Sequence, residues 1–387
     1  GFHRYSTDRY WHVPHFEKML YDQGQLTVSY LDAYQITHDR TFADIANNIL
    51  QYVSRDLQCK SGGFYSAEDA DSFPHECSEQ KKEGAFCVWT CSEVEKALSE
   101  YIEGSESIKL SDVFCQHYGV SSGGNVGFEH DPHGELKDQN VLMVRGTIED
   151  TAKKYKLNMK TTQDALKKCR EILFVERQKR PRPHLDNKMI TAWNGLMISG
   201  FARAGQVLHN AEYTESALKA ANFIRTYMYN VDTGCLLRSS YVDEGGDVSQ
   251  ICPPINGFLD DYAALIRGLL DLYEACYDDT WLEWAEQLQQ KQDDLFWDSE
   301  NAGYFTVADN DPSILLRIKE DQDGAEPSPN SISVMNLFRL SNYLNNEEWY
   351  KKAVDLLQVF SERLEKIPLA LPEMVCAIMY NVGAPKQ

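Results

Sequence analysis

Two histidines near the start of the chain have side chains suited to proton transfer. His12 and His15 flank Pro14, and Glu17 and Asp22 follow shortly after. Imidazole titrates close to neutral pH, so this group predicts general acid/base chemistry. Pro14 favours a loop over a helix, and a zinc site would lack a clear third ligand. The alternative is that these residues cap the next helix and hold its loop by hydrogen bonds.

A second candidate group is acidic and follows a glycine turn. Glu68, Asp69 and Asp71 come directly after Gly62 and Gly63. Carboxylates this close repel one another unless a cation lies near, which is typical of a functional site or an ion pair. A carboxylate pair would supply the acid and the base or nucleophile of glycoside hydrolysis. The alternative is a solvated acidic loop.

A third group has the side chains that proteins use to bind sugars. Trp193 offers a flat face to a sugar ring, and Asn194, with Asp186 and Lys188 before it, offers hydrogen bonds to hydroxyls. The alternative is that Trp193 packs in the core, which is the commoner role of Trp. The remaining substrate-binding candidates are Arg4, Asp260, Asp261, Tyr262 and Glu326. Adjacent Asp residues in a first helical turn are also favoured by the helix dipole alone.

The elements that must position these residues form a repeat of two helices followed by a glycine turn. The repeat covers four segments, 22–70, 193–241, 261–308 and 330–368. In the first three, the same interval separates the start of the first helix from the aromatic residue that opens the second (22 to 42, 193 to 213, 261 to 281). One hairpin cannot bury its own apolar face, so hairpins must stack in a row or close into a ring. We expect the first helix of each pair inside and the second, charged on one face, outside.

The region 73–185 interrupts this repeat. Helical patterns are predicted over 93–100, 111–118 and 161–179, with a loop containing short strands over 121–138. A polar loop is predicted over 309–329.

Several runs of residues resemble one known family. They are HVPHFEKMLYDQ (12–23), GFYSAEDADS (63–72), EGAFCVWT (83–90), and DNK (186–188) with TAWNG (191–195). Together they resemble the spermatogenesis-associated protein 20 family and its bacterial thioredoxin-domain-containing relatives. The resemblance covers essentially the whole chain. It implies an all-α fold, the (α/α)6 six-hairpin toroid of N-acylglucosamine 2-epimerases and several glycoside hydrolases, as a single domain over 1–387. The family's thioredoxin-like domain is absent from this chain and is a candidate partner.

Composition excludes other classes of protein. The 387 residues include 38 Lys and Arg against 59 Asp and Glu, a net charge of −21. Such a surface repels phosphate backbones and anionic lipids, so we expect no nucleic-acid or membrane partner. Ten scattered Cys without a CxxC pair, and no N-glycosylation sequon, favour the cytoplasm over the alternative of secretion. No dinucleotide, P-loop, GxSxG or HExxH motif is present, so we expect no cofactor and no metal.

These observations lead to one favoured function and two alternatives. We expect a pocket that binds a small-molecule substrate, a sugar, and isomerises or epimerises it by proton transfer. His12, His15, Glu68, Asp69 and Asp71 are the catalytic candidates. The alternatives are glycoside hydrolysis by a carboxylate pair, and a toroid without catalytic activity that binds a ligand or partner, with the role in spermatogenesis or fertility that the family name implies.

Overall fold

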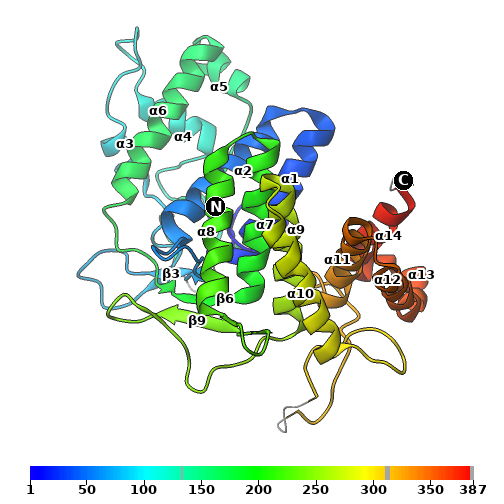
Figure 1. The fold of residues 1–387 in the computed structure, drawn as a ribbon. Helices are drawn as coiled ribbons and strands as arrows, with labels where there is room; N and C mark the ends of the chain where they lie inside the picture. Colours follow the sequence, from blue (N-terminus) through cyan, green and yellow to red (C-terminus); the bar gives the residue numbers. More distant parts are fainter. Residues whose placement is uncertain (132–133, 310–313, 384–387) are drawn as a thin grey trace. The chain divides into compact units, whose positions relative to one another are not determined.

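The chain forms two compact units. The computed structural model describes residues 1–131, 134–309 and 314–383. Unit 1 contains residues 1–2, 19–67 and 186–387, and unit 2 contains residues 3–18 and 68–185. Figure 1 draws the ribbon and labels the helices and some of the strands. The expectation of a single domain over 1–387 stays a prediction.

Unit 1 is built from pairs of consecutive helices, as the repeat predicts. The first helices are α1 (Leu20–Thr37), α7 (Thr191–Val207), α9 (Leu259–Cys276) and α11 (Pro329–Leu344). Their partners are α2 (Arg40–Tyr52), α8 (Ala211–Tyr227), α10 (Asp279–Phe296) and α12 (Glu347–Val359). The predicted two-helix unit is therefore confirmed in all four segments.

The two helices of each pair are connected by the same kind of turn. A residue with positive φ follows the first helix, and the next residue, an Asp or Asn, caps the second helix. The four turns are His38–Asp39, His209–Asn210, Tyr277–Asp278 and Asn345–Asn346. The cap side chain accepts a main-chain N–H of the second helix, which satisfies a donor that would otherwise lack a partner. The short sequence signal of each turn thus fixes where one helix ends and the next begins.

The first helices pack closely because small residues face one another. A Cβ built at Gly24 would lie 2.9 Å from the main chain of Leu196, and one built at Gly195 would lie 2.5 Å from that of Ala264. Further along the same helices, Gly200 lies against Thr27 and Gly268 lies against Ile198. The contacts follow the same order along each helix, so α1, α7 and α9 run in the same direction. The packing order is α1, α7, α9, α11, followed by α14 (Pro372–Gly383). The N-terminal ends of α1, α7 and α9 consequently lie at the same end of unit 1.

The loops between pairs are tied to the next first helix by asparagines. The Asn194 carboxamide accepts the N–H of Phe64 (2.8 Å) and donates to the Phe64 carbonyl (3.0 Å). Asn330 makes the same two bonds with Tyr304, both at 3.0 Å. Both aromatic residues follow the glycine of a turn, as the repeat predicts. Each turn is therefore held against the helix that follows it in the repeat.

Short strands and helical turns complete unit 1. The antiparallel strands are β6 (Lys188–Ile190), β9 (Ser239–Val242) and β10 (Val248–Ser249), with a separate pair of β7 (Tyr229–Asn230) and β8 (Cys235–Leu236). The remaining elements are the π-helical turn η1 (Val53–Leu57), α13 (Ser361–Lys366) and the 3-10 turn η3 (Pro368–Ala370).

Unit 2 has its own apolar core beneath four helices. They are α3 (Cys91–Ala97), α4 (Leu110–Tyr118), α5 (Ile148–Tyr155) and α6 (Met159–Arg177). The core gathers Trp89, Val94, Phe114 and Leu166. Three of these helices confirm the sequence prediction; the polar α5 was not predicted, since it buries only Thr151 and Ala152.

The short strands expected over 121–138 are wrong for the described part of that segment. It contains turns and the 3-10 helix η2 (Phe128–His130) instead. Side-chain bonds hold it: the Asp131 carboxylate accepts the N–H groups of Glu135 and Leu136, both at 2.9 Å. These bonds replace the strand ladder that the sequence pattern predicted.

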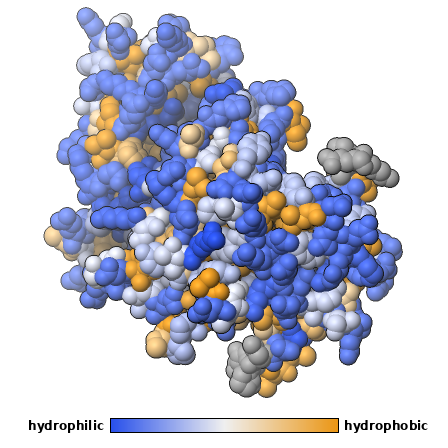
Figure 2. Space-filling view, viewed as in Figure 1, coloured by the Kyte–Doolittle hydropathy of each residue, from blue (hydrophilic) through white to orange (hydrophobic). Residues whose placement is uncertain are grey.

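The strands of unit 2 are β3 (Asp71–Ser72) and β4 (Lys82–Glu83), which pair antiparallel. Three further strands, β1 (Lys18–Met19), β2 (Ala67–Glu68) and β5 (Leu185–Asp186), lie where the chain passes from one unit to the other. The face shown in Figure 2 is mostly hydrophilic with scattered apolar residues, as the composition predicts.

Candidate functional site

The N-terminal ends of three first helices carry aromatic and acidic side chains. Tyr21 and Asp22 lie in the first turn of α1, Trp193 in the first turn of α7, and Asp260 in the first turn of α9. Tyr21 and Trp193 pack edge to face, with their ring centroids 5.0 Å apart. Trp193 and Asp260 are half-buried, so a ligand can reach both.

Glu326 reaches this end of unit 1 from the loop before α11. Its Oε1 accepts the indole N–H of Trp193 at 2.9 Å. The loop is held on either side: the Asp323 carboxylate accepts the N–H of Ser328 (2.9 Å), and Gln25 donates to the carbonyl of Ala325 (3.0 Å). The Glu326 carboxyl is therefore fixed against the indole.

The surroundings of Glu326 change its acidity. Burial raises the pKa of its carboxyl to about 7, and the carboxylates of Asp260 and Asp22 add to the rise. The hydrogen bond from Trp193 and the charge of Arg238 lower the pKa but do not offset the burial. A carboxyl with this pKa exists in both protonation states near neutral pH, so it can accept or donate a proton.

Arg238 supplies the positive charge of the cluster. Its guanidinium donates to the Asp260 carboxylate and, at 3.0 Å, to Oδ2 of Asp261. Asp261 is fully buried, and its other oxygen accepts the N–H of Ala192 at 2.9 Å. Asp261 thus anchors Arg238, while the half-buried Asp260 faces the region of Glu326. Sequence reasoning missed Arg238; the available signal is a lone basic residue after the glycine turn at Gly234.

Other sequence candidates from unit 1 support the fold around this cluster. Asn194 is fully buried and holds Phe64, and the fully buried Tyr262 accepts the N–H of Leu236 at 2.9 Å. Asp186 forms an ion pair of 3.2 Å with Lys188. We therefore define the acidic cluster as Tyr21, Asp22, Trp193, Arg238, Asp260 and Glu326.

The histidine candidates lie in unit 2 on an extended loop. His15 Nδ1 accepts the N–H of Glu17 (3.3 Å), and Glu17 forms an ion pair of 3.3 Å with Arg4. His12 Nε2 is buried and has no hydrogen-bond partner within the described residues. Neither ring caps α1, whose cap residue, Met19, makes no side-chain hydrogen bond. The structure thus brings Arg4, His15 and Glu17 together.

The three acidic candidates after the first glycine turn each face another charged group. Glu68 forms an ion pair of 3.1 Å with Arg182. The Asp69 carboxylate lies 3.8 Å from the ammonium of Lys81. Asp71 pairs with Glu83 across β3 and β4; partial burial raises its pKa, and neighbouring carboxylates, including that of Asp69, add to the rise.

The described residues contain neither a cluster of metal ligands nor a helix suited to a membrane. No group of three or more His, Cys, Asp or Glu there is placed to hold a metal ion. No helix in the described ranges is long and apolar enough to cross a bilayer.

The fold places the chain among the helical-hairpin toroids. The cellobiose 2-epimerase of Spirochaeta thermophila is similar to this chain with a TM-score of 0.52 and 9% identity, covering 94% of this chain and 64% of that one. At this identity the likeness shows the fold alone. It confirms the predicted (α/α)6 class.

The sequence is similar to that of spermatogenesis-associated protein 20 from two mammals. The chain is 50% identical to human spermatogenesis-associated protein 20 and 52% identical to the mouse protein, over 100% and 97% of its length. The resemblance predicted from the sequence is confirmed. The chain spans about half the length of these relatives, 49% of the human and 48% of the mouse protein. No family model matches it.

Proposed function

We propose that the acidic cluster of unit 1 binds a neutral sugar and transfers a proton on the carbon next to its carbonyl group. The observation that carries the proposal is the Glu326 carboxyl, hydrogen-bonded to Trp193 at 2.9 Å beside Asp260 and Arg238. Its raised pKa suits it to proton exchange at neutral pH. The structurally similar toroid is a sugar 2-epimerase, which supports this reaction class.

The chemistry assigned to Glu326 is a proton exchange in two steps. The carboxylate removes the proton from C2 of the open-chain aldose, and the electron pair moves onto the carbonyl oxygen to give an enediolate. The carboxylic acid then returns a proton to carbon. If the enediolate first turns its other face to the acid, return of the proton to C2 inverts that carbon, which is epimerisation. Return of the proton to C1, with the C2 hydroxyl proton moving to the C1 oxygen, gives the ketose, which is isomerisation.

The aromatic and charged neighbours define the substrate class. The exposed part of the Trp193 ring offers the flat surface on which a sugar ring stacks. Asp22, Asp260 and Glu326 give the cluster three carboxyl groups against the single guanidinium of Arg238. Negative charge repels phosphate and carboxylate groups, so we propose neutral sugars in preference to sugar phosphates.

The catalytic role expected of His12 and His15 in unit 2 stays a proposal of its own. The variants His12→Asn and His15→Asn test this role separately from that of Glu326.

The experiment measures exchange of the C2 hydrogen with solvent. The chain is incubated in D2O with a panel of neutral aldoses and disaccharides, and loss of the C2 proton signal is followed by NMR. We expect exchange with at least one sugar, and we expect Glu326→Gln to reduce the rate by about 100-fold or more. The amide oxygen of that variant can still accept the indole N–H, which preserves the local fold.

The matched control is Asp321→Asn, in the same loop at an exposed position. We expect it to exchange at the rate of the unmodified chain. Exchange that survives Glu326→Gln would contradict the proposed role of Glu326. Release of reducing ends without exchange would instead support glycoside hydrolysis.

A further inference from the structure

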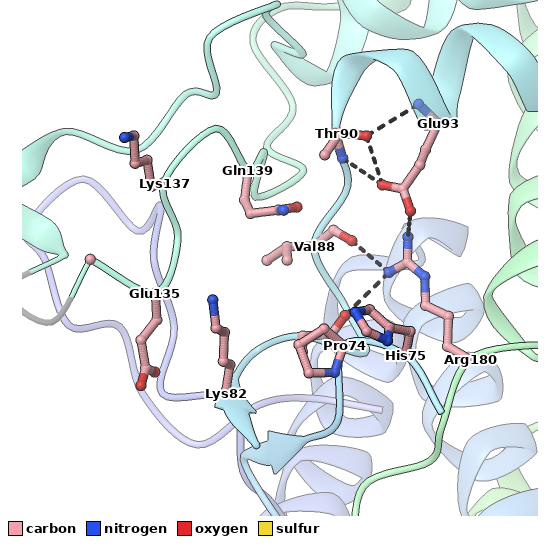
Figure 3. A pocket seen from close by; sticks show the side chains of 12 residues that line it. Pro74, His75, Lys82, Val88, Thr90, Glu93, Glu135, Lys137, Gln139 and Arg180 are labelled. Carbon is pink, nitrogen blue, oxygen red and sulfur yellow. Dashed lines mark hydrogen bonds and ion pairs between the residues drawn. The ribbon is translucent and has the colours of Figure 1, made fainter. Parts of the chain in front are cut away.

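Unit 2 contains a pocket of about 440 Å³ that the proposed function does not use. Its walls come from the β3–β4 hairpin, the segment leading into α3, the residues after η2, and Arg180 beyond α6. Figure 3 shows the side chains that line it. The volume lies within the range that proteins use for small molecules.

The walls are fastened together by hydrogen bonds. Arg180 donates to the carbonyl oxygens of Val88 (2.5 Å) and Phe86 (3.1 Å), and pairs with Glu93 at 3.3 Å. Its guanidinium lies 4.0 Å from the centre of the Trp89 ring. Trp89 and Asn140 exchange main-chain bonds of 3.1 and 2.7 Å. These contacts hold the wall before α3 to the wall after η2, so the pocket is formed before any ligand arrives.

The guanidinium of Arg180 is occupied by these contacts. Two lysines of the pocket make no such contacts. Neither Lys82 nor Lys137 forms an ion pair with any residue that the structure describes, and both line the pocket. The register of the hairpin accounts for Lys82: it pairs with Ser72, while the next residue, Glu83, pairs with Asp71 and points to the opposite face. Figure 3 shows the Lys82 ammonium extending into the space between Glu135 and Gln139.

The acidic side chains of the pocket do not neutralise these lysines. Glu93 is paired with Arg180 and also accepts the N–H of Thr90 (2.8 Å). Glu135 accepts the main-chain N–H of Glu83 at 3.0 Å and forms no ion pair with Lys82 or Lys137 in the part of the chain that the structure describes. Unpaired ammonium groups are unexpected in a chain whose net charge is −21, because carboxylates are in excess.

The rest of the lining is partly apolar. Pro74, Ala85 and the buried Val88 contribute hydrocarbon surface, and the carboxamide of Gln139 has no side-chain hydrogen bond among the residues described. The pocket thus combines two ammonium groups that have no ion pair among the described residues, an amide and an apolar patch.

We propose that this pocket binds a small molecule with one phosphate or carboxylate group on an apolar body. The anionic group lies between the ammonium groups of Lys82 and Lys137 and accepts a hydrogen bond from Gln139. The apolar body covers Val88 and Pro74. This site is separate in chemistry from the acidic cluster of unit 1, which repels anions.

Binding of two probe anions to the whole chain tests the proposal. Phenyl phosphate and benzoate carry the two anionic groups on the same ring, and their dissociation constants are measured by calorimetry up to about 10 mM ligand. We expect one of them to bind, with phenol, which lacks the charge, at least tenfold weaker. The tighter anion identifies the acid class. We expect affinity to fall as salt rises.

Substitutions of the two lysines locate the binding. Lys82→Met and Lys137→Met keep the hydrocarbon stems, and each is expected to weaken binding about tenfold or more. The matched control is Lys81→Met, beside Lys82 and paired with Asp69 instead of lining the pocket; its affinity should stay unchanged. Both lysines are exposed, so the variants should fold, as circular dichroism would verify. Absence of binding by both anions, or equal affinity in all three variants, would overturn the proposal.

Discussion

Glu326 shows how burial of a single carboxyl group makes the stability of the folded chain depend on pH. Its carboxyl lies in a half-buried place beside two other carboxylates, and its pKa is raised from 4.5 to about 7. The folded state therefore binds a proton more tightly than the unfolded state does. Between these two pKa values the folded protein loses stability as pH rises, because the unfolded chain ionises first.

The variant Glu326→Gln should remove this pH-dependent loss. Below pH 4.5 the side chain at position 326 is uncharged in both proteins. Their free energies of unfolding should therefore differ by a constant amount in that range. As pH rises through about 7, the free energy of unfolding of the variant should gain up to about 3 kcal/mol over the unmodified chain, less what solvent screening removes. Urea unfolding of both proteins at several pH values measures the difference. A difference independent of pH would contradict the raised pKa.

The sequence indicated some members of the acidic cluster and missed others. Trp193, Asp22 and Asp260 were predictable because residues at helix starts in a repeat should lie at the same end. Arg238 was not, because its role depends on the buried Asp261, which accepts from both Arg238 and Ala192. Asn194 was predicted to bind sugar, yet its amide holds Phe64, a contact across 130 residues that no local pattern shows.

At the scale of elements, small residues decide how the first helices of unit 1 pack. Gly195 on α7 faces the main chain of Ala264 on α9, and Gly268 on α9 faces the carbonyl of Gly195. Helices with Gly at the contact approach more closely than helices with larger side chains. The repeat predicted which helices are inside, but sequence alone could not show which glycines lie at the contact.

Gly195→Ala should be strongly destabilising, whereas Gly200→Ala in the same helix should not. The new methyl group at position 195 would lie 2.5 Å from rigid main chain, so the helices must separate, at a cost of about 1–3 kcal/mol or more. At position 200 the nearest atom is the flexible end of Met197, at 3.1 Å, and the nearest main-chain atom, the carbonyl oxygen of Gly24, lies at 3.3 Å. The better helix propensity of Ala offsets part of this milder strain. Urea midpoints compare the two variants. Equal losses in both would contradict the packing argument.

At the scale of the whole molecule, composition and the sequence repeat predicted the acidic character and the helix pairs. The excess of carboxylates agrees with the acidic cluster, and the regular intervals of the repeat predicted the four helix pairs. The region 73–185 was less predictable, because turns held by single side chains, such as Asp131, replace periodic elements there.

The ten cysteines give a prediction for the whole chain, since all are free thiols in the structure. A thiol reagent applied in denaturant, without reductant, should count ten groups. Under native conditions the exposed Cys77, Cys252 and Cys376 should react first, and the buried Cys59 and Cys169 last. A count below ten that rises to ten after reduction would show disulfides and contradict the reduced state.

We propose that Glu326 exchanges a proton with a bound sugar. The most direct test of this exchange is the rate of C2 hydrogen exchange as a function of pH, measured by NMR in D2O for the sugar that exchanges fastest. We expect an inflection near pH 7, the pKa of the Glu326 carboxyl, and loss of that inflection together with most of the rate in Glu326→Gln. No exchange with any neutral sugar, or a profile that the substitution leaves unchanged, would contradict it.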